Sequence, residues 1–273
     1  MSAVVSAERR CRLSLALVLA IGVASCAPRT VQVALPGGQG QPMTDAALGA
    51  QVDALTAPCR DLAALTADLR IAGRVDGERV RGTLQVGVEA GGVRLEGVPP
   101  FGAPVFILAG RVGDATLLFP RDGVFVSNVP VAALIEAVVG VALTPPDLLA
   151  LLGGCGISAG SPTGARAFGS GWARLDFPDE VTMWLRQEGA SAPALRVADT
   201  RHWRVDYEIP RPGQPVRGVL TRKGGATTAL SFEVSAPERL SALPEAAFDV
   251  TVPADARALP LEHFRRQRVL AES

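Results

Sequence analysis

Residues 68–96 read DLRIAGRVDGERVRGTLQVGVEAGGVRLE, and apolar and polar side chains alternate through most of this stretch. The apolar positions from Leu69 to Val88 keep a period of two on either side of a turn at Asp76-Gly77. Successive side chains of a β-strand point to opposite faces, so the pattern predicts strands that are apolar on one face and hydrated on the other. The Asp-Gly turn and a glycine-rich turn at 90–92 predict hairpins, as in an antiparallel sheet.

Shorter stretches with the same alternation lie on both sides of this region. Further strands are predicted at 104–109, 114–119, 123–126, 172–177, 181–185, 193–197, 202–208, 216–221, 228–234 and 248–252, with a Gly/Ser-rich loop at 153–171. A helix is predicted over 44–67, capped by Thr44 and interrupted near Pro58. Strands do not alternate with helices in a βαβ order, so the fold class is α+β with an antiparallel sheet of about 10–12 strands.

Two apolar helices are predicted where residues 131–153 interrupt the strands. The first runs from Val131 to Val139 and carries Glu136 as its one charge. The second begins at Thr144, where Asp147 is placed for a capping box, and ends at the Gly153-Gly154 pair. A helix that is apolar on all sides must be buried or must face an apolar cavity. We therefore expect these helices to form a lid over the apolar face of the sheet.

Residues 1–25 have the features of a secretory signal: three arginines, a short apolar run and small residues at the end. The sequence Val23-Ala-Ser-Cys26 resembles a bacterial lipobox, which implies cleavage before Cys26 and lipidation of that cysteine. An ordinary signal peptide with an incidental cysteine is the alternative. Residues 26–43 are rich in proline, glycine and glutamine and are expected to form a flexible tether. Residues 44–273 are expected to form a single domain.

Charge and cysteine content restrict the function further. The whole chain has 27 basic and 27 acidic residues, and loss of residues 1–25 removes three arginines and one glutamate. The remaining net charge of −2 argues against nucleic acid as a partner. Cys59 and Cys155 are left in an oxidising compartment, which predicts a disulfide between them, although two separate thiols remain the alternative. We expect no metal site, because no CxxC or HxxxH spacing is present.

Catalytic motifs are not apparent. His202 falls on the polar face of a predicted strand and His263 in a charged tail, and neither has an evident nucleophile partner. No GxSxG sequence occurs, and Gly153-Gly154-Cys155-Gly156 lacks the lysine of a phosphate-binding loop. We expect a protein that is not an enzyme and has no cofactor.

An ordered set of motifs resembles the LolB family. Residues 93–102, VRLEGVPPFG, are similar to a strand followed by the family's exposed Pro-Leu-Gly loop. Residues 134–140 and 144–153 resemble its two helices, and Trp203-Arg-Val-Asp-Tyr207 resembles its Trp-x-Val-x-Tyr strand. LolB is an outer-membrane lipoprotein that accepts other lipoproteins from the periplasmic carrier LolA and inserts them into the membrane. Three departures are Phe101 in place of the leucine, the extension over 236–273 and the cysteine pair.

The resemblance implies a curved, incompletely closed antiparallel β-barrel, covered by a helical lid, around an apolar cavity for acyl chains. It implies an exposed apolar loop at Pro100, Phe101 and Gly102. The expected cavity and lid residues are Leu69, Ile71, Leu84, Val86, Leu95, Leu134, Val138, Leu148, Leu151, Leu152, Trp203 and Val205.

The expected function is to bind the acyl chains of client lipoproteins and help to insert them, with a LolA-like carrier as donor. The expected location is the periplasmic face of the outer membrane, reached through the lipid on Cys26. Ala27 is consistent with this, because aspartate at that position retains lipoproteins at the inner membrane in enterobacteria-like sorting. The alternatives are a lipid- or glycolipid-binding envelope lipoprotein and a structural envelope lipoprotein.

Overall fold

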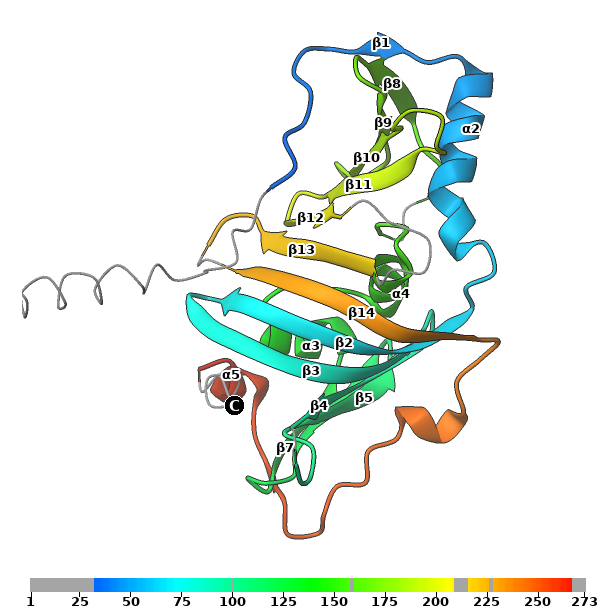
Figure 1. The fold of residues 1–273 in the computed structure, drawn as a ribbon. Helices are drawn as coiled ribbons and strands as arrows, with labels where there is room; N and C mark the ends of the chain where they lie inside the picture. Colours follow the sequence, from blue (N-terminus) through cyan, green and yellow to red (C-terminus); the bar gives the residue numbers. More distant parts are fainter. Residues whose placement is uncertain (1–31, 100, 158–159, 209–215, 226–227, 267–273) are drawn as a thin grey trace, which may run out of the picture. The chain divides into compact units, whose positions relative to one another are not determined.

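The computed structural model describes residues 32–99, 101–157, 160–208, 216–225 and 228–266 (Figure 1). The signal sequence, Cys26 and Pro100 lie outside the described residues. None of the helices in the described part of the chain combines the length and apolarity needed to cross a bilayer.

The described residues form one large, curved and unclosed sheet of fifteen strands. The strands are β1 (Gln41–Pro42), β2 (Ala64–Val75), β3 (Glu78–Glu89), β4 (Gly92–Val98), β5 (Ile107–Arg111), β6 (Asp114–Phe119), β7 (Val124–Val129), β8 (Gly164–Phe168), β9 (Trp172–Asp176), β10 (Thr182–Arg186), β11 (Ala194–Asp199), β12 (Trp203–Tyr207), β13 (Val216–Arg222), β14 (Ala229–Leu240) and β15 (Arg257–Ala258).

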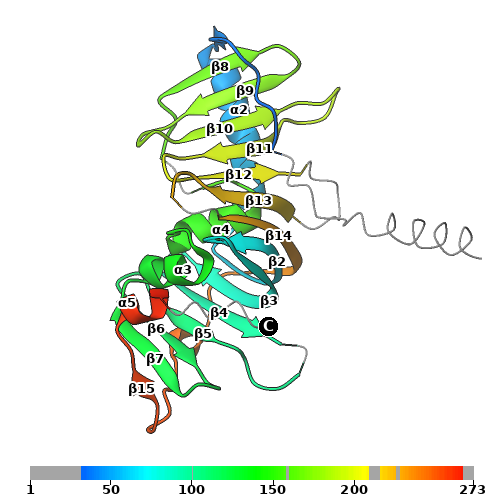
Figure 2. The same cartoon turned by 90° about the vertical axis from the view of Figure 1, so that its left-hand side faces the viewer.

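The sheet consists of two antiparallel meanders joined side by side. Strands β2 to β7 pair in sequence order, as do β8 to β14, and β14 pairs with β2. Figure 2 shows the strands following one another from β8 to β15. Every neighbouring pair is antiparallel except β15 with β7. The predicted hairpin order is therefore confirmed, but the match to a barrel is only coarse because the sheet does not close.

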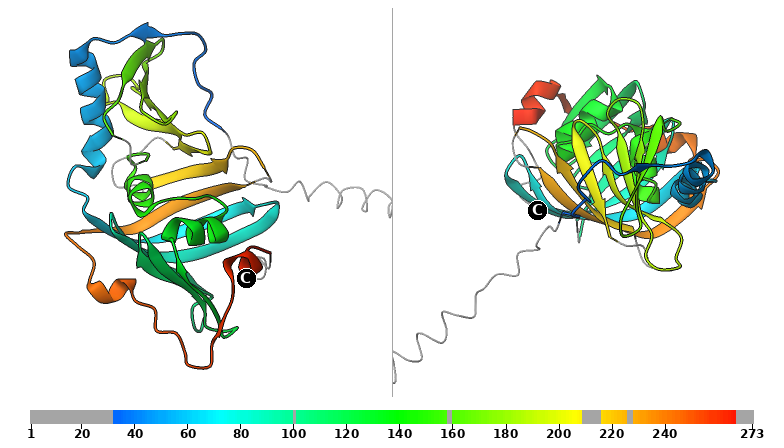
Figure 3. Two further views of the ribbon diagram at one scale, coloured as in Figure 1. Left: turned by 180° about the vertical axis from the view of Figure 1, so that it is seen from behind. Right: turned by 90° about the horizontal axis from the view of Figure 1, so that it is seen from above.

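Two helices carry the chain from β7 to β8, at opposite ends of the strand order. They are α3 (Val131–Val139) and α4 (Pro145–Gly153), as predicted. The Thr144 hydroxyl accepts a hydrogen bond from the Asp147 amide, and the Asp147 carboxylate accepts one from the Thr144 amide, which completes the predicted capping box. Both helices lie on one face of the sheet, called here the inner face (Figure 3). Their apolar side chains join those of the sheet in a single buried cluster.

The remaining helices are α2 (Asp45–Thr56), η1 (Ala57–Cys59), η2 (Glu245–Phe248) and α5 (Leu261–Arg266). Thr44 caps α2 as predicted, with its hydroxyl accepting from the Ala47 amide. The helix predicted over 44–67 is too long, because residues 64–67 belong to β2. Their side chains continue the alternation of that strand, and they pair with residues 86–89 of β3. Pairing of the backbone with β3 therefore overrides the helical spacing.

A disulfide joins Cys59 and Cys155, as predicted, with their Cα atoms 6.2 Å apart. Cys59 ends η1, and Cys155 follows the C-terminal cap of α4. The bond therefore fixes the segment before β2 to the end of the helical insertion.

Residues 33–42, expected to form a flexible tether, are instead held against the sheet: residues 33–40 lie along the outer face of β8–β12, and Gln41–Pro42 form β1, which pairs with β8 at the edge. Val33 and Leu35 pack against a cluster formed by Trp172, Trp184 and Val197. The Val33 amide donates to Asp206 Oδ1 at 2.9 Å, and Arg204 Nη2 donates to the Val33 carbonyl at 2.6 Å. Arg204 and Asp206 also form an ion pair. These three residues, Val33, Arg204 and Asp206, are called the N-terminal clasp.

The C-terminal extension covers the other end of the sheet. Phe248 is buried, and the Arg111 guanidinium lies 4.4 Å from its ring. Strand β15 then pairs with β7 and covers that edge, and Phe264 on α5 packs 5.1 Å from the Phe119 ring. The strand predicted at 248–252 is wrong: Phe248 ends η2, and residues 249–252 pair with no strand among the described residues. Strand β8, in contrast, lies inside the predicted 153–171 loop.

Tyr207, the one tyrosine of the chain, fastens the end of α4 to β12. Its buried hydroxyl lies 3.2 Å from the Leu151 carbonyl and 3.4 Å from the Gly156 carbonyl. Burial raises the pKa of this hydroxyl far above its usual value, because the phenolate would lose its hydration, and the hydrogen bond to Gly156 opposes the rise only in part.

Replacement of Tyr207 by phenylalanine is expected to lower the free energy of unfolding by about 1 kcal/mol, since one buried hydrogen-bonding group is lost. The pKa is higher in the folded than in the unfolded protein, so the contribution of the hydroxyl is complete below about pH 10. It declines as the pH rises further. Ultraviolet titration of the wild type should therefore show tyrosinate only together with unfolding. A tyrosinate signal near pH 10 from folded protein would contradict this description.

Candidate functional site

An opening lies between β3 and the loop that follows β4. Strand β3 pairs with β2 along its whole length, from Glu78 to Glu89. Its pairing with β4 ends where Thr83 faces Val98. Residues 78–82 of β3 therefore extend beyond β4, which ends at Val98, and β5 begins only at Ile107. Because residues 78–82 pair with β2 on one side only, space is left on the side where β4 has ended.

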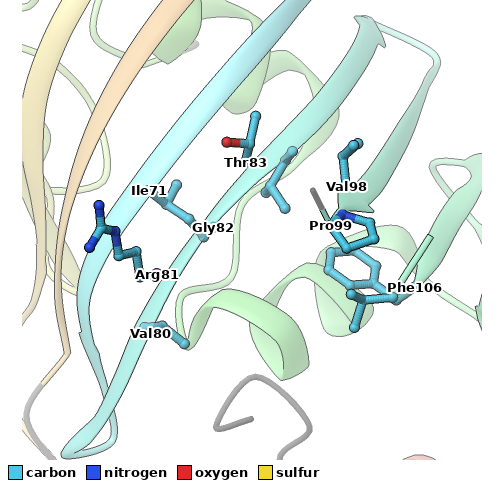
Figure 4. Close-up of a pocket in the computed structure, with 11 residues that line it drawn as sticks. Ile71, Val80, Arg81, Gly82, Thr83, Val98, Pro99 and Phe106 are labelled. Atoms are coloured by element: carbon cyan, nitrogen blue, oxygen red, sulfur yellow. The ribbon is translucent and has the colours of Figure 1, made fainter. Parts of the chain in front are cut away.

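This space is a pocket of about 490 Å³, within the ~300–1,000 Å³ that ligand sites usually occupy. Its lining comes from both faces of the sheet edge, and Figure 4 shows the side chains around it. The residues are Ile71, Val80, Arg81, Gly82, Thr83, Leu84, Gly97, Val98, Pro99, Val105 and Phe106.

The floor of the pocket is apolar. Ile71, Val80, Leu84 and Phe106 are buried and belong to the face of the sheet that carries α3 and α4. The rim is formed by Thr83, Val98 and Pro99, and by Arg81 on the other side of the opening, whose guanidinium is directed away from Val98 and Pro99 (Figure 4). The site thus combines an apolar interior with one hydroxyl and one cation at its edge.

Two glycines shape the pocket. The Gly97 amide donates to the Phe106 carbonyl at 3.0 Å, and a Cβ at residue 97 would lie only 2.8 Å from the Phe106 ring. Glycine at residue 97 therefore allows the Phe106 ring to pack against the backbone at the bottom of the pocket. Gly82 has no atom within 4 Å of its own Cβ position. The absence of a side chain at residue 82 therefore leaves part of the pocket open.

The loop beside the pocket presents Phe101 to solvent. Its side chain is 90% exposed, which is unusual for a large apolar residue. Gly102 has a φ of +91°, a conformation that favours glycine, and Arg121 donates to the Ala103 carbonyl at 2.9 Å. These contacts hold the loop while leaving the phenyl ring in water.

All twelve expected cavity and lid residues belong to the main hydrophobic cluster, and two of them, Ile71 and Leu84, also line the pocket. The other ten are buried in the main hydrophobic cluster, where those of α3 and α4 pack against the inner face of the sheet: Leu69, Val86, Leu95, Leu134, Val138, Leu148, Leu151, Leu152, Trp203 and Val205. The helices therefore fill much of the space beneath them with their own side chains.

Sequence reasoning missed five apolar lining residues: Val80, Val98, Pro99, Val105 and Phe106. The signal that could have found them is the unequal length of the strands in the β3–β4 hairpin. An apolar strand end without a partner on one side predicts a hollow at that edge.

The lining offers little for covalent chemistry. The lining residues include no carboxylate, imidazole or thiol. They therefore provide neither an acid–base pair nor a nucleophile with an adjacent base. What the arrangement can do is exclude water from an apolar group and hold a polar group at the rim.

Comparison with known proteins gives distant similarities only. The chain matches no protein-family model, and no curated protein sequence matches it significantly. One similar solved structure is an uncharacterised conserved protein from Thermus thermophilus, 13% identical, covering 79% of this chain and 99% of that one with a TM-score of 0.35. LprF from Mycobacterium bovis is 16% identical, covering 80% of this chain and 100% of its own, with a TM-score of 0.28. The lipoprotein LppX from Mycobacterium tuberculosis is 16% identical, covering 77% and 100%, with a TM-score of 0.28. Similarities at this level define neither a family nor a ligand for the chain.

Proposed function

We propose that this protein binds acyl chains in the pocket between β3 and the β4–β5 loop. The observation that carries the proposal is an apolar pocket of about 490 Å³ that opens at the surface beside an exposed phenylalanine. Such a site needs no catalytic residue, because an acyl chain moves from one apolar environment to another without any change in its covalent bonds. Each methylene group removed from water contributes about 0.8 kcal/mol.

The lipobox-like sequence at Cys26 supports a location at a membrane. A lipid-anchored protein in the cell envelope meets acyl chains in the bilayer and on other lipoproteins. We further propose that the protein receives such chains from a LolA-like carrier and delivers them to the outer membrane. Phe101, in the loop between the lining residues Pro99 and Val105, would enter the bilayer during delivery.

A second candidate function is structural. The side chains of α3 and α4 that pack tightly on the sheet favour a rigid envelope lipoprotein without cargo. Lipid mass spectrometry of the protein purified from its native membranes separates the two. Bound lipid or lipoprotein supports the first function, and protein free of both supports the second.

Replacement of Gly82 by phenylalanine is expected to weaken acyl-chain binding by roughly 100-fold, because the ring would occupy the space of three or four methylene groups at about 0.8 kcal/mol each. The strand conformation at residue 82 does not require glycine, and its Cβ position is open, so folding should be preserved. Titration with a fluorescent fatty-acid probe measures the change.

Gly82→Ala is the matched control, since a methyl group leaves most of the pocket open. Equal affinity of the alanine and phenylalanine variants, both with wild-type circular dichroism, would locate the acyl chain elsewhere and defeat the proposal.

A further inference from the structure

The charge around the pocket has a single sign. Arg81 is the one ionic residue of the lining, and its side chain is exposed. Among the described residues it has neither a hydrogen bond nor an ion pair. The floor of the pocket is apolar, so any charge on a bound molecule would be placed at the rim, on the exposed face of β3 that carries Arg81 and within reach of its side chain.

The neighbouring residues strengthen the positive charge. Arg79 lies two residues from Arg81 in β3, and therefore on the same face, and it sits directly opposite Arg74 of β2. Like charges in directly opposed positions destabilise a sheet. Arg74 donates to the Gly77 carbonyl at 2.6 Å, but no carboxylate of the described residues lies within ion-pair distance of these three arginines. An anion bound here would relieve this repulsion.

Arg70, on the same face of β2, provides a contrast. It is paired with Glu233 at 3.0 Å, so its charge is already compensated. The uncompensated arginines are therefore grouped at the end of the β2–β3 hairpin, where β3 borders the pocket.

We propose that the ligand of this pocket is an amphiphile with an anionic headgroup. The acyl chain lies on Ile71, Val80, Leu84 and Phe106, and the phosphate or carboxylate is held by Arg81 with the field of Arg74 and Arg79. This inference rests on the proposed function and adds the class of headgroup to it. A phosphocholine headgroup fits less well, because its trimethylammonium group would be repelled by the same arginines.

Two lysophospholipids with the same chain test the headgroup: palmitoyl lysophosphatidylglycerol, which is anionic, and palmitoyl lysophosphatidylcholine, which is zwitterionic. Isothermal titration of the wild type below the micelle concentration should give roughly fivefold to tenfold tighter binding of the anionic lipid, since exposed ion pairs are individually weak. The preference should shrink as salt is added.

Arg81→Gln should remove most of the preference, because it should weaken binding of the anionic lipid more than binding of the zwitterionic lipid. Arg60→Gln is the matched control for net charge, because Arg60 is an exposed arginine after η1 and lies outside the pocket. This variant should keep the preference for the anionic lipid. Equal binding of both lipids by the wild type, or a full preference in Arg81→Gln, would overturn the headgroup assignment alone. Failure of both lipids to bind would overturn the proposed function as well.

Discussion

Loss of the Cys59–Cys155 disulfide is expected to lower the free energy of unfolding by about 4–5 kcal/mol. The two cysteines are 96 residues apart in the sequence, so the bond removes a large loop from the freedom of the unfolded chain. Folded domains are typically stable by only about 5–15 kcal/mol, and the reduced protein should therefore be close to unfolding at physiological temperature.

Urea denaturation with and without a reductant measures this effect. The reductant should shift the midpoint of the wild type to lower urea and leave that of a Cys59→Ala, Cys155→Ala double variant unchanged. Identical midpoints for oxidised and reduced wild type would show that the bond does not contribute to stability. The effect of the double variant would then reflect only the truncated side chains.

Replacement of Asp206 by alanine should cost about 3 kcal/mol, because it leaves a largely buried arginine without its counter-ion. The side chains of Arg204 and Asp206 are 17% and 2% exposed, and they lie 2.5 Å apart. The variant also leaves the Val33 amide without its acceptor. Loss of the N-terminal clasp should therefore release residues 33–35 from the tryptophan cluster.

The neighbouring pair Arg174 and Asp176 is a built-in control. It has the same spacing in the sequence and a similar separation of 2.6 Å, but its side chains are 37% and 25% exposed. Asp176→Ala should therefore cost no more than about 1 kcal/mol. Chemical denaturation measures both variants, and hydrogen exchange of the Val33 amide reports the clasp directly. Equal losses for Asp206→Ala and Asp176→Ala would mean that burial of the clasp has no energetic consequence.

The elements that the sequence predicted well are those whose signals are local. The alternation from Leu69 to Val88 marks β2 and β3, and the Thr144–Asp147 capping box marks the start of α4. Both depend on residues that are neighbours in the chain. The cysteine pairing was accessible for a different reason, since only two cysteines remain once the signal and the lipobox cysteine are set aside.

The features that were missed depend on contacts between distant residues. Strand β8 carries small or charged side chains apart from Phe168, and it is held by pairing with β9 and with β1. The segment at 33–42 has the composition of a linker, but Asp206 and Trp184 hold it in place. The pocket arises from the register at which β4 stops pairing with β3, which local periodicity does not encode.

The N-terminal clasp also limits the length of free chain between Cys26 and the folded domain. If Cys26 carries the acyl anchor, as proposed, six residues lie between it and Val33, and the seven residue-to-residue steps span at most about 25 Å when fully extended. Without the clasp, the next contact that holds the chain to the sheet is the Gln39 carbonyl, which accepts a hydrogen bond from Arg166, and the maximum span from Cys26 would rise to about 45 Å. A protein anchored in this way would stay within about 25 Å of the membrane, so we expect any donor of acyl chains to meet it at the membrane surface.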